Sequence, residues 1–91
     1  MENFKINVLG ESWNVKFVKI NDCGICNPEN KTIYINSSLD KNSMVITILH
    51  EMFHAYVRRS GIYNGMLSSD MEEIIADQFS TVISENFDFT I

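Results

Sequence analysis

The spacing of apolar residues changes near residue 40, and this change constrains the possible folds more than any other feature of the sequence. Up to that point apolar and polar residues mostly alternate, with the period of two that half-buried strands have. Beyond it the apolar residues recur every three or four positions, as along one face of an amphipathic helix. Strands followed by helices predict a small α+β domain with the helices packed on one face of the sheet. The length of 91 residues suits a single domain, residues 1–91.

The expected sheet has three strands. Two alternating runs flank the turn signal Gly10-Glu11 and predict an N-terminal hairpin, and a short β-branched run predicts a third strand at the sheet edge. The stretch between them is rich in loop-forming residues and holds the one proline of the chain. Two helices follow, and a capping-box pattern begins the second. The expected ranges are Phe4–Leu9, 13–20 and Thr32–Asn36 for strands, Asn21–Lys31 for the loop, and Ser43–Ser60 and Ser69–Ile83 for helices.

The only two histidines of the chain belong to one motif, His50-Glu51-Met52-Phe53-His54, which has the pattern H-E-x-x-H inside the first expected helix. Residues four apart lie on one face of a helix, so both imidazoles can converge on one tetrahedral zinc ion. Glu51 points elsewhere and can act as general base on a zinc-bound water. Both histidines fall at the boundary of the apolar stripe, where a cleft would lie. The alternative is two histidines that stand four apart by chance.

A catalytic zinc usually has a third protein ligand, and with no further histidine that ligand has to be a carboxylate. The second expected helix offers Glu72 and Glu73. Glu73 is favoured because Asp77 lies on its face and can accept the free N–H of a ligand histidine, while the small residues Ala76 and Ser80 allow close helix packing. Glu72 lies nearer the apolar stripe, which favours it as the inward carboxylate, but it can also belong to the capping box. A solvated acidic first turn is the alternative for both.

Three segments carry a resemblance: Thr32-Ile33-Tyr34-Ile35-Asn36, His50-Glu51-x-x-His54 and Glu73-x-x-Ala76-Asp77-x-Phe79-Ser80. Together they resemble the ImmA/IrrE-type metallo-endopeptidases, which are compact, gluzincin-like zinc peptidases. The resemblance implies that His50, His54 and Glu73 bind Zn²⁺ and that Glu51 is the catalytic glutamate. Members often cleave a partner regulatory protein, which implies a protein or peptide substrate. Ser80 departs from the alanine common in the family, and SprT-like and other minimal H-E-x-x-H proteins are also similar.

The chain is therefore expected to be a zinc-dependent metallo-endopeptidase, a hydrolase that cleaves a peptide bond with water activated by Glu51. Tyr34, Tyr56 and Tyr63 are candidates for a second oxyanion donor, and their spacing singles out none. The Thr32–Asn36 strand, as a sheet edge beside the cleft, could hold an extended peptide by strand addition. The competing interpretation is a catalytically silent zinc-binding module that acts by docking a protein partner.

The charge balance and the cysteines limit which classes of partner and which cellular compartment the sequence predicts. Twelve acidic and seven basic side chains give a net charge of −5, without the clustered Lys/Arg footprint of a nucleic-acid surface. No apolar run is long enough to predict a membrane span, and residues 1–10 lack the pattern of a signal peptide. Two cysteines without a secretion signal favour the cytoplasm. Cys23 and Cys26 are expected to be reduced thiols in a glycine turn, with a redox-gated loop as the alternative.

Overall fold

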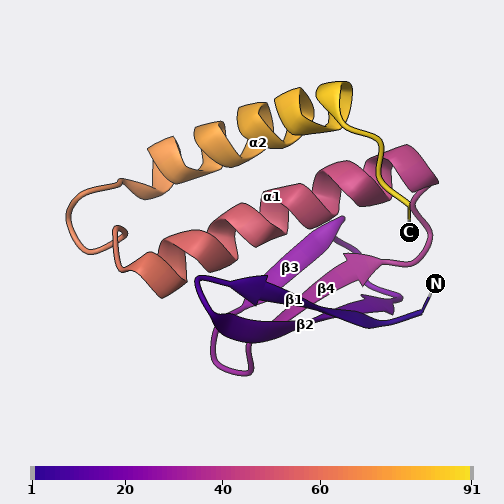
Figure 1. Cartoon of the computed structure of the whole chain (residues 1–91), viewed down its shortest axis with the longest axis horizontal. Helices are drawn as coiled ribbons and strands as arrows, with labels where there is room; N and C mark the ends of the chain where they lie inside the picture. The colour runs from indigo at the N-terminus through magenta and orange to yellow at the C-terminus, as the bar shows by residue number, and fades with distance from the viewer. Residues whose placement is uncertain (1, 91) are drawn as a thin grey trace.

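The computed structural model describes residues 2–90, which form a sheet, a first helix on the sheet and a second helix beyond the first (Figure 1). The strands are β1 Phe4–Val8, β2 Glu11–Val18, β3 Gly24–Asn27 and β4 Thr32–Asn36, and the helices are α1 Lys41–Ser60 and α2 Ser69–Asn86. The α+β class is confirmed. α1 packs on β1, β3 and β4, whereas α2 packs on α1. The expectation that both helices cover the sheet is therefore wrong.

The sheet has four strands in the order β1-β2-β4-β3, one more than expected. β1 and β2 form the expected antiparallel hairpin, and its turn residues Leu9 and Gly10 both have positive φ, as a tight hairpin turn requires. β4 pairs parallel with β2 and antiparallel with β3. The loop expected over 21–31 thus contains a strand, and β4 is an inner strand instead of the edge. The sheet ends at β1 on one side and at β3 on the other.

The core lies between the sheet and α1. Val15 of β2 and both Ile33 and Ile35 of β4 are completely buried, and Trp13 is the largest of the deeply buried side chains. From α1 the core receives Met44, Ile48 and Ala55. Burial of one large apolar side chain stabilises the fold by roughly 1.5–3 kcal/mol relative to leaving it exposed. This packing fixes α1 on the sheet and so fixes the direction in which its other faces point.

Each end of α1 has the residue type that helix geometry favours there. Asp40 precedes the helix and accepts a hydrogen bond from the backbone N–H of Ser43 at 2.8 Å. Gly61 follows the helix with a φ of 82°, the left-handed conformation in which glycine commonly ends helices. Within residues 2–90, neither helix combines the length and apolar character that crossing a membrane requires.

The start of α2 differs from the expected capping box. Its N-cap is Ser68, whose hydroxyl accepts the backbone N–H of Met71 at 3.1 Å, and not Ser69. A helix N-cap is the residue whose side-chain oxygen accepts a backbone N–H of the first turn, and here Ser68 does so, one residue before the serine of the expected pattern. With Ser68 as the cap, the side chain of Glu72 is not part of a capping box and is free to reach α1.

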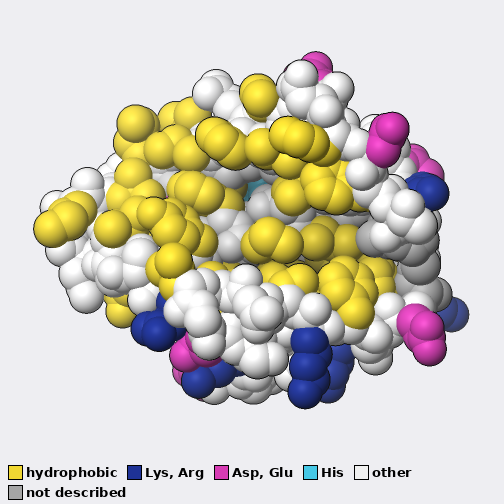
Figure 2. All heavy atoms as spheres, in the orientation of Figure 1, with side chains coloured by type: hydrophobic (Ala, Val, Ile, Leu, Met, Phe, Trp, Pro, Cys, Tyr) yellow, Lys and Arg dark blue, Asp and Glu magenta, His cyan; other side chains and the backbone are white. Residues whose placement is uncertain are grey.

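α2 meets α1 with small residues and leaves much of its apolar stripe in contact with solvent. Ala76 and Ser80 are buried at the contact, as the close helix packing expected from them requires. The periodicity predicts that the stripe faces the core, and this is wrong for side chains that are about half exposed: Met71, Ile74, Phe79 and Val82. Figure 2 shows hydrophobic side chains gathered over the face of α1 and α2 that it presents. Of the carboxylates that contact the α1 histidines, Glu72 lies toward α1 with 16% of its side chain exposed, whereas Glu73 and Asp77 are 57% and 67% exposed.

Gly24 allows β3 to approach α1 closely. A Cβ atom at this position would lie 2.6 Å from Cγ2 of Thr47 and 3.0 Å from Cγ of Glu51, both on α1. Carbon atoms in close-packed proteins do not approach so near, so only glycine fits here without a shift of strand or helix. The edge strand therefore lies directly against the helix that carries both histidines.

A Gly24→Ala variant is expected to lose about 1–3 kcal/mol of unfolding free energy, because the added methyl group overlaps the Thr47 side chain. Chemical denaturation measures the loss. Thr47→Ser removes the methyl group nearest to the new Cβ, so the double variant should recover part of the stability that Gly24→Ala loses. A Gly24→Ala protein as stable as the unaltered chain would contradict the close approach of β3 to α1.

Candidate metal centre

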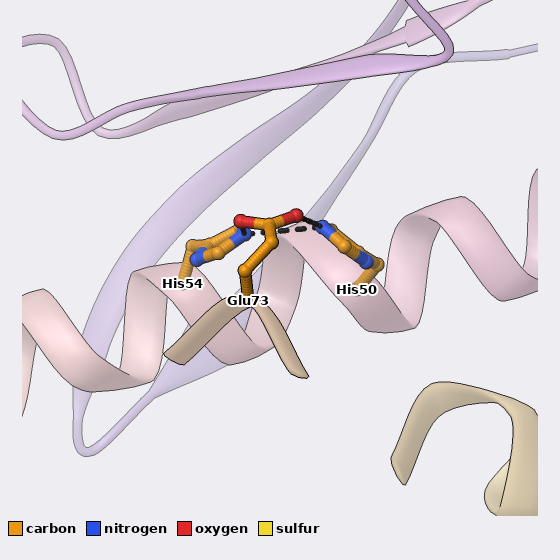
Figure 3. A group of neighbouring side chains, drawn as sticks. All are labelled: His50, His54 and Glu73. Atoms are coloured by element: carbon orange, nitrogen blue, oxygen red, sulfur yellow. Dashed lines mark hydrogen bonds and ion pairs between the residues drawn. The ribbon is translucent and has the colours of Figure 1, made fainter. Parts of the chain in front are cut away.

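His50 and His54 lie one turn apart on α1, and their rings meet near α2 (Figure 3). Their Nε2 atoms are 3.1 Å apart. Both side chains are mostly buried, with 16% and 17% of their surface exposed. Since α1 is fixed on the sheet by its buried residues, the two imidazoles are held in one row along the helix.

Glu73 of α2 reaches across both rings. One carboxylate oxygen, Oε1, lies 2.9 Å from Nε2 of His50, and Oε2 lies 3.3 Å from Nε2 of His54. One ligand atom from each of the three residues lies within 4.8 Å of the others. Figure 3 shows the carboxylate bridging the two imidazoles from the opposite helix. The structure thus brings together the three residues that the sequence singles out as zinc ligands.

The spacing of the two imidazole nitrogens fits a tetrahedral zinc ion, and a carboxylate oxygen lies close enough to be a third ligand. With Zn–N and Zn–O distances of about 2.0–2.1 Å, tetrahedral coordination places two ligand atoms about 3.3 Å apart. The two Nε2 atoms are 3.1 Å apart, and each lies near a different oxygen of Glu73, His50 at 2.9 Å from Oε1 and His54 at 3.3 Å from Oε2. With one ligand atom from each residue, all three lie within 4.8 Å of one another. Glu73 is 57% exposed, so the cluster is open to solvent on one side. An open side is what a catalytic metal site needs for water or substrate.

A second carboxylate contacts the far nitrogen of each ring. Nδ1 of His50 lies 3.0 Å from Oδ1 of Asp77, and Nδ1 of His54 lies 2.5 Å from Oε2 of Glu72. When Nδ1 donates its hydrogen to a carboxylate, Nε2 of the neutral ring keeps a lone pair for a metal. The sequence predicts that Asp77 contacts a ligand histidine without specifying which one, and in the structure that histidine is His50. Glu72 contacts the outer nitrogen of His54 and is absent from the three-residue cluster, a role that the sequence analysis missed.

Glu51 occupies a different position from the other acidic residues of the site. Its side chain projects from α1 toward β3, where its Cγ lies close to the space above Gly24, and only 7% of the residue is exposed. Burial raises the pKa of the Glu51 carboxyl, and the neighbouring imidazoles of His50 and His54 act in the opposite direction. Glu51 is outside the three-residue cluster, as its place on the helix predicts.

A pocket of about 380 Å³ lies beside the histidines. One wall is the edge strand β3 with the residues that follow it, and the opposite walls are α1 and the start of α2. Its lining residues are Gly24, Ile25, Cys26, Pro28, His50, Glu51, His54, Arg58, Glu72 and Glu73. Arg58 and β3 are parts of the site that were not predicted from the sequence. Arg58 could have been found from its spacing of four from His54, whereas β3 had no local signal.

None of the three tyrosine candidates lines this pocket. The hydroxyl of Tyr34 accepts a hydrogen bond from Asn30, Tyr56 packs beside Phe53, and Tyr63 lies under the guanidinium of Arg58. Within residues 2–90 the structure therefore assigns no tyrosine to an oxyanion site.

The two cysteines occupy different environments. Cys23 is exposed, whereas Cys26 lies within β3 and is half-buried, so the expectation of a loop position is wrong for Cys26. Burial raises the pKa of the Cys26 thiol to about 12. A thiol with so high a pKa is protonated at neutral pH and is a weak nucleophile. Cys26 therefore contributes packing and an apolar wall to the pocket.

No protein-family model, no curated protein and no solved structure matches this chain. The resemblance to the ImmA/IrrE-type metallo-endopeptidases therefore stays a prediction from the motifs. The features that bear on function are the cluster of His50, His54 and Glu73 and the carboxylates that contact Nδ1 of each histidine.

Proposed function

We propose that this chain is a zinc-dependent metallo-endopeptidase whose metal ligands are His50, His54 and Glu73. The observation that carries the proposal is the donor set of two imidazole nitrogens and one carboxylate within 4.8 Å. Two histidines and a glutamate are the ligands of known zinc hydrolases, in which a fourth position stays open for water or substrate. Imidazole ligands favour zinc over magnesium or calcium, which prefer all-oxygen sites.

The proposed reaction is hydrolysis of a peptide bond. A zinc ion held by His50, His54 and Glu73 would act as a Lewis acid on the attacking water and on the substrate carbonyl. Glu51 accepts a proton from the attacking water and then delivers a proton to the leaving amine. Its burial suits this role, because desolvation raises the pKa of its carboxyl and makes the carboxylate a stronger base. Glu72 and Asp77 hold the imidazoles in their orientation.

The proposed substrate is a protein or peptide that binds in an extended conformation along β3. This strand is the sheet edge nearest the histidines, and its first three residues line the pocket. An edge strand offers unpaired backbone groups to which an extended chain can add as a further strand. Strand addition thus belongs to β3 and not to the inner strand β4. The resemblance adds a regulatory protein as the kind of substrate to test, and the cytoplasm as compartment stays a prediction.

Metal reconstitution and an unbiased cleavage assay test the proposal. After dialysis against zinc, the protein is expected to retain one zinc ion per chain by elemental analysis. It should then cleave a peptide mixture prepared from a whole-cell digest, with new termini read by mass spectrometry. A chelator should stop the cleavage and added zinc should restore it. A chain that retains no stoichiometric metal would overturn the proposal.

A second candidate function is a catalytically silent zinc-binding module that docks a protein partner. The half-exposed apolar side chains of α2 favour it, because isolated soluble domains seldom leave a helix stripe of this size in water. Both candidates require zinc, so the metal content does not separate them. One zinc ion per chain together with no chelator-sensitive cleavage would decide for the docking module.

A further inference from the structure

One cation lines the pocket beside the histidines. Arg58 follows His54 by four residues, so His50, His54 and Arg58 form one row along α1. It is the only lysine or arginine among the described lining residues, and the other charged side chains there are those of Glu51, Glu72 and Glu73. The row therefore ends in a positive group just beyond the proposed metal ligands.

The guanidinium of Arg58 is unpaired although carboxylates surround the pocket. Among residues 2–90 it takes part in none of the ion pairs or side-chain hydrogen bonds. Its central carbon lies 4.8 Å from the centroid of the Tyr63 ring, a cation–π contact. Such a contact uses the face of the guanidinium and leaves the N–H groups along its edge available to an anion.

The helix dipole explains only part of this arrangement. Cations are favoured in the last turn of a helix, and both Arg58 and Arg59 lie there. Arg59, however, points toward the sheet, where its Nε is 3.9 Å from Oε2 of Glu11. The dipole accounts for two arginines at the end of α1, but it does not account for one of them lining the pocket without an anionic partner.

We propose that Arg58 binds a carboxylate of the substrate, so that the pocket selects peptides with a carboxylate close to the scissile bond. A guanidinium forms paired hydrogen bonds to a carboxylate, and these are among the strongest and most specific in proteins. The chain carries a net charge of −5, so a substrate anion is repelled except where the metal and Arg58 supply positive charge. This inference rests on the proposed peptidase function.

The reach of Arg58 limits where that carboxylate can be. Four residues of helix separate the Cα atoms of His54 and Arg58 by about 6 Å along the axis. An extended peptide advances about 3.3 Å per residue, so the carboxylate belongs within about two residues of the bond that is cleaved. Either the C-terminal carboxylate of a peptide or an aspartate or glutamate side chain can supply it.

Dicarboxylate probes test the site without hydrolysis. Succinate, glutarate and adipate each offer one carboxylate to the metal and one to Arg58, and their monoamides lack the second charge. Calorimetry with the zinc-loaded protein is expected to show that at least one diacid binds about 10–100-fold more tightly than its monoamide. Arg58→Gln should reduce that ratio to about one, whereas Arg59→Gln, the matched loss of charge in the same helix turn, should preserve it. A ratio that Arg58→Gln leaves unchanged would overturn the inference.

Peptide substrates then identify the source of the carboxylate. Cleaved peptides are compared with a free or an amidated C-terminus, and with glutamate or glutamine within two residues of the scissile bond. Arg58→Gln is expected to raise KM for the preferred acidic form with little change in kcat, as for an interaction made equally in ground and transition states. Zinc uptake and the diacid preference without any cleavage count against the peptidase proposal. Equal cleavage of the peptides with and without these carboxylates counts against the Arg58 site alone.

Discussion

A Glu51→Gln variant is expected to keep its zinc and to lose about 10²–10⁴-fold in the rate of peptide cleavage. The amide has nearly the shape of the carboxylate but cannot accept a proton from water. None of the three residues of the metal cluster is altered, so elemental analysis should still give one zinc ion per chain. The measurement is kcat/KM for a cleaved peptide, and Glu85→Gln on the exposed side of α2 is the matched control.

Folding does not confound this prediction. Burial raises the pKa of the Glu51 carboxyl, so in the folded state its charged form is disfavoured relative to the unfolded chain. At a pH above the unfolded pKa the ionised group therefore costs stability, and a neutral amide removes that cost. The free energy of unfolding of zinc-free Glu51→Gln is expected to equal or exceed that of the unaltered protein. A cleavage rate of Glu51→Gln within about threefold of that of the unaltered protein would contradict the assignment of Glu51 as the general base.

The elements that the sequence predicts best are those whose local pattern agrees with their packing. β1 and β2 alternate between more buried and more exposed side chains, and Val15 is completely buried as the alternation predicts. The β-branched run that predicts β4 places Ile33 and Ile35 in the core. α1 has an apolar stripe and ends at Ser60 as expected, although it begins at Lys41, two residues before the expected Ser43. The motif residues His50 and His54 could be placed on one helix face because that placement depends only on helical geometry.

β3 could not be predicted because its local sequence favours turns. It has only four residues, begins with Gly24 and lies next to the one proline, Pro28. The strand exists because its backbone pairs with β4 and because Gly24 fits against α1. Both causes are contacts with distant parts of the chain, and no window of sequence contains them. Because β3 was not predicted, β4 was predicted to be the sheet edge, whereas the edge strand on this side is β3.

The predicted orientation of α2 was wrong for a different reason. An apolar stripe predicts a buried face only where another apolar surface is available to cover it. Here the neighbouring face of α1 carries two imidazoles, and they contact Glu72, Glu73 and Asp77. α2 therefore turns Glu72, Ala76 and Ser80 toward α1 and leaves much of its apolar stripe exposed. From the sequence, Glu72 and Glu73 were alternatives for the third metal ligand. In the structure both contact the histidines, Glu72 at Nδ1 of His54 and Glu73 at the two Nε2 atoms.

A His54→Ala variant is expected to lose stoichiometric zinc binding. It removes one of the two imidazole nitrogens of the cluster and leaves Glu72 without its contact on α1. A site with only one histidine and one largely exposed carboxylate holds zinc too weakly to survive dialysis. Elemental analysis after dialysis and competition with a chromophoric chelator measure the effect. In the unaltered protein zinc at 100 times its Kd should add about 2.7 kcal/mol of stability, and in His54→Ala zinc should not raise Tm.

The Glu72→Gln variant tests whether Glu72 orients the ligand His54 or is itself a metal ligand. All three members of the metal cluster remain, but the charged acceptor at Nδ1 of His54 is replaced by an amide. Loss of such an orienting carboxylate typically weakens a metal site about 10–100-fold, so Glu72→Gln should still bind zinc and still gain Tm from it. Glu73→Gln should resemble His54→Ala instead, because it removes a ligand. Equal zinc affinities in Glu72→Gln and Glu73→Gln would contradict the assignment of Glu73 to the metal and Glu72 to the imidazole.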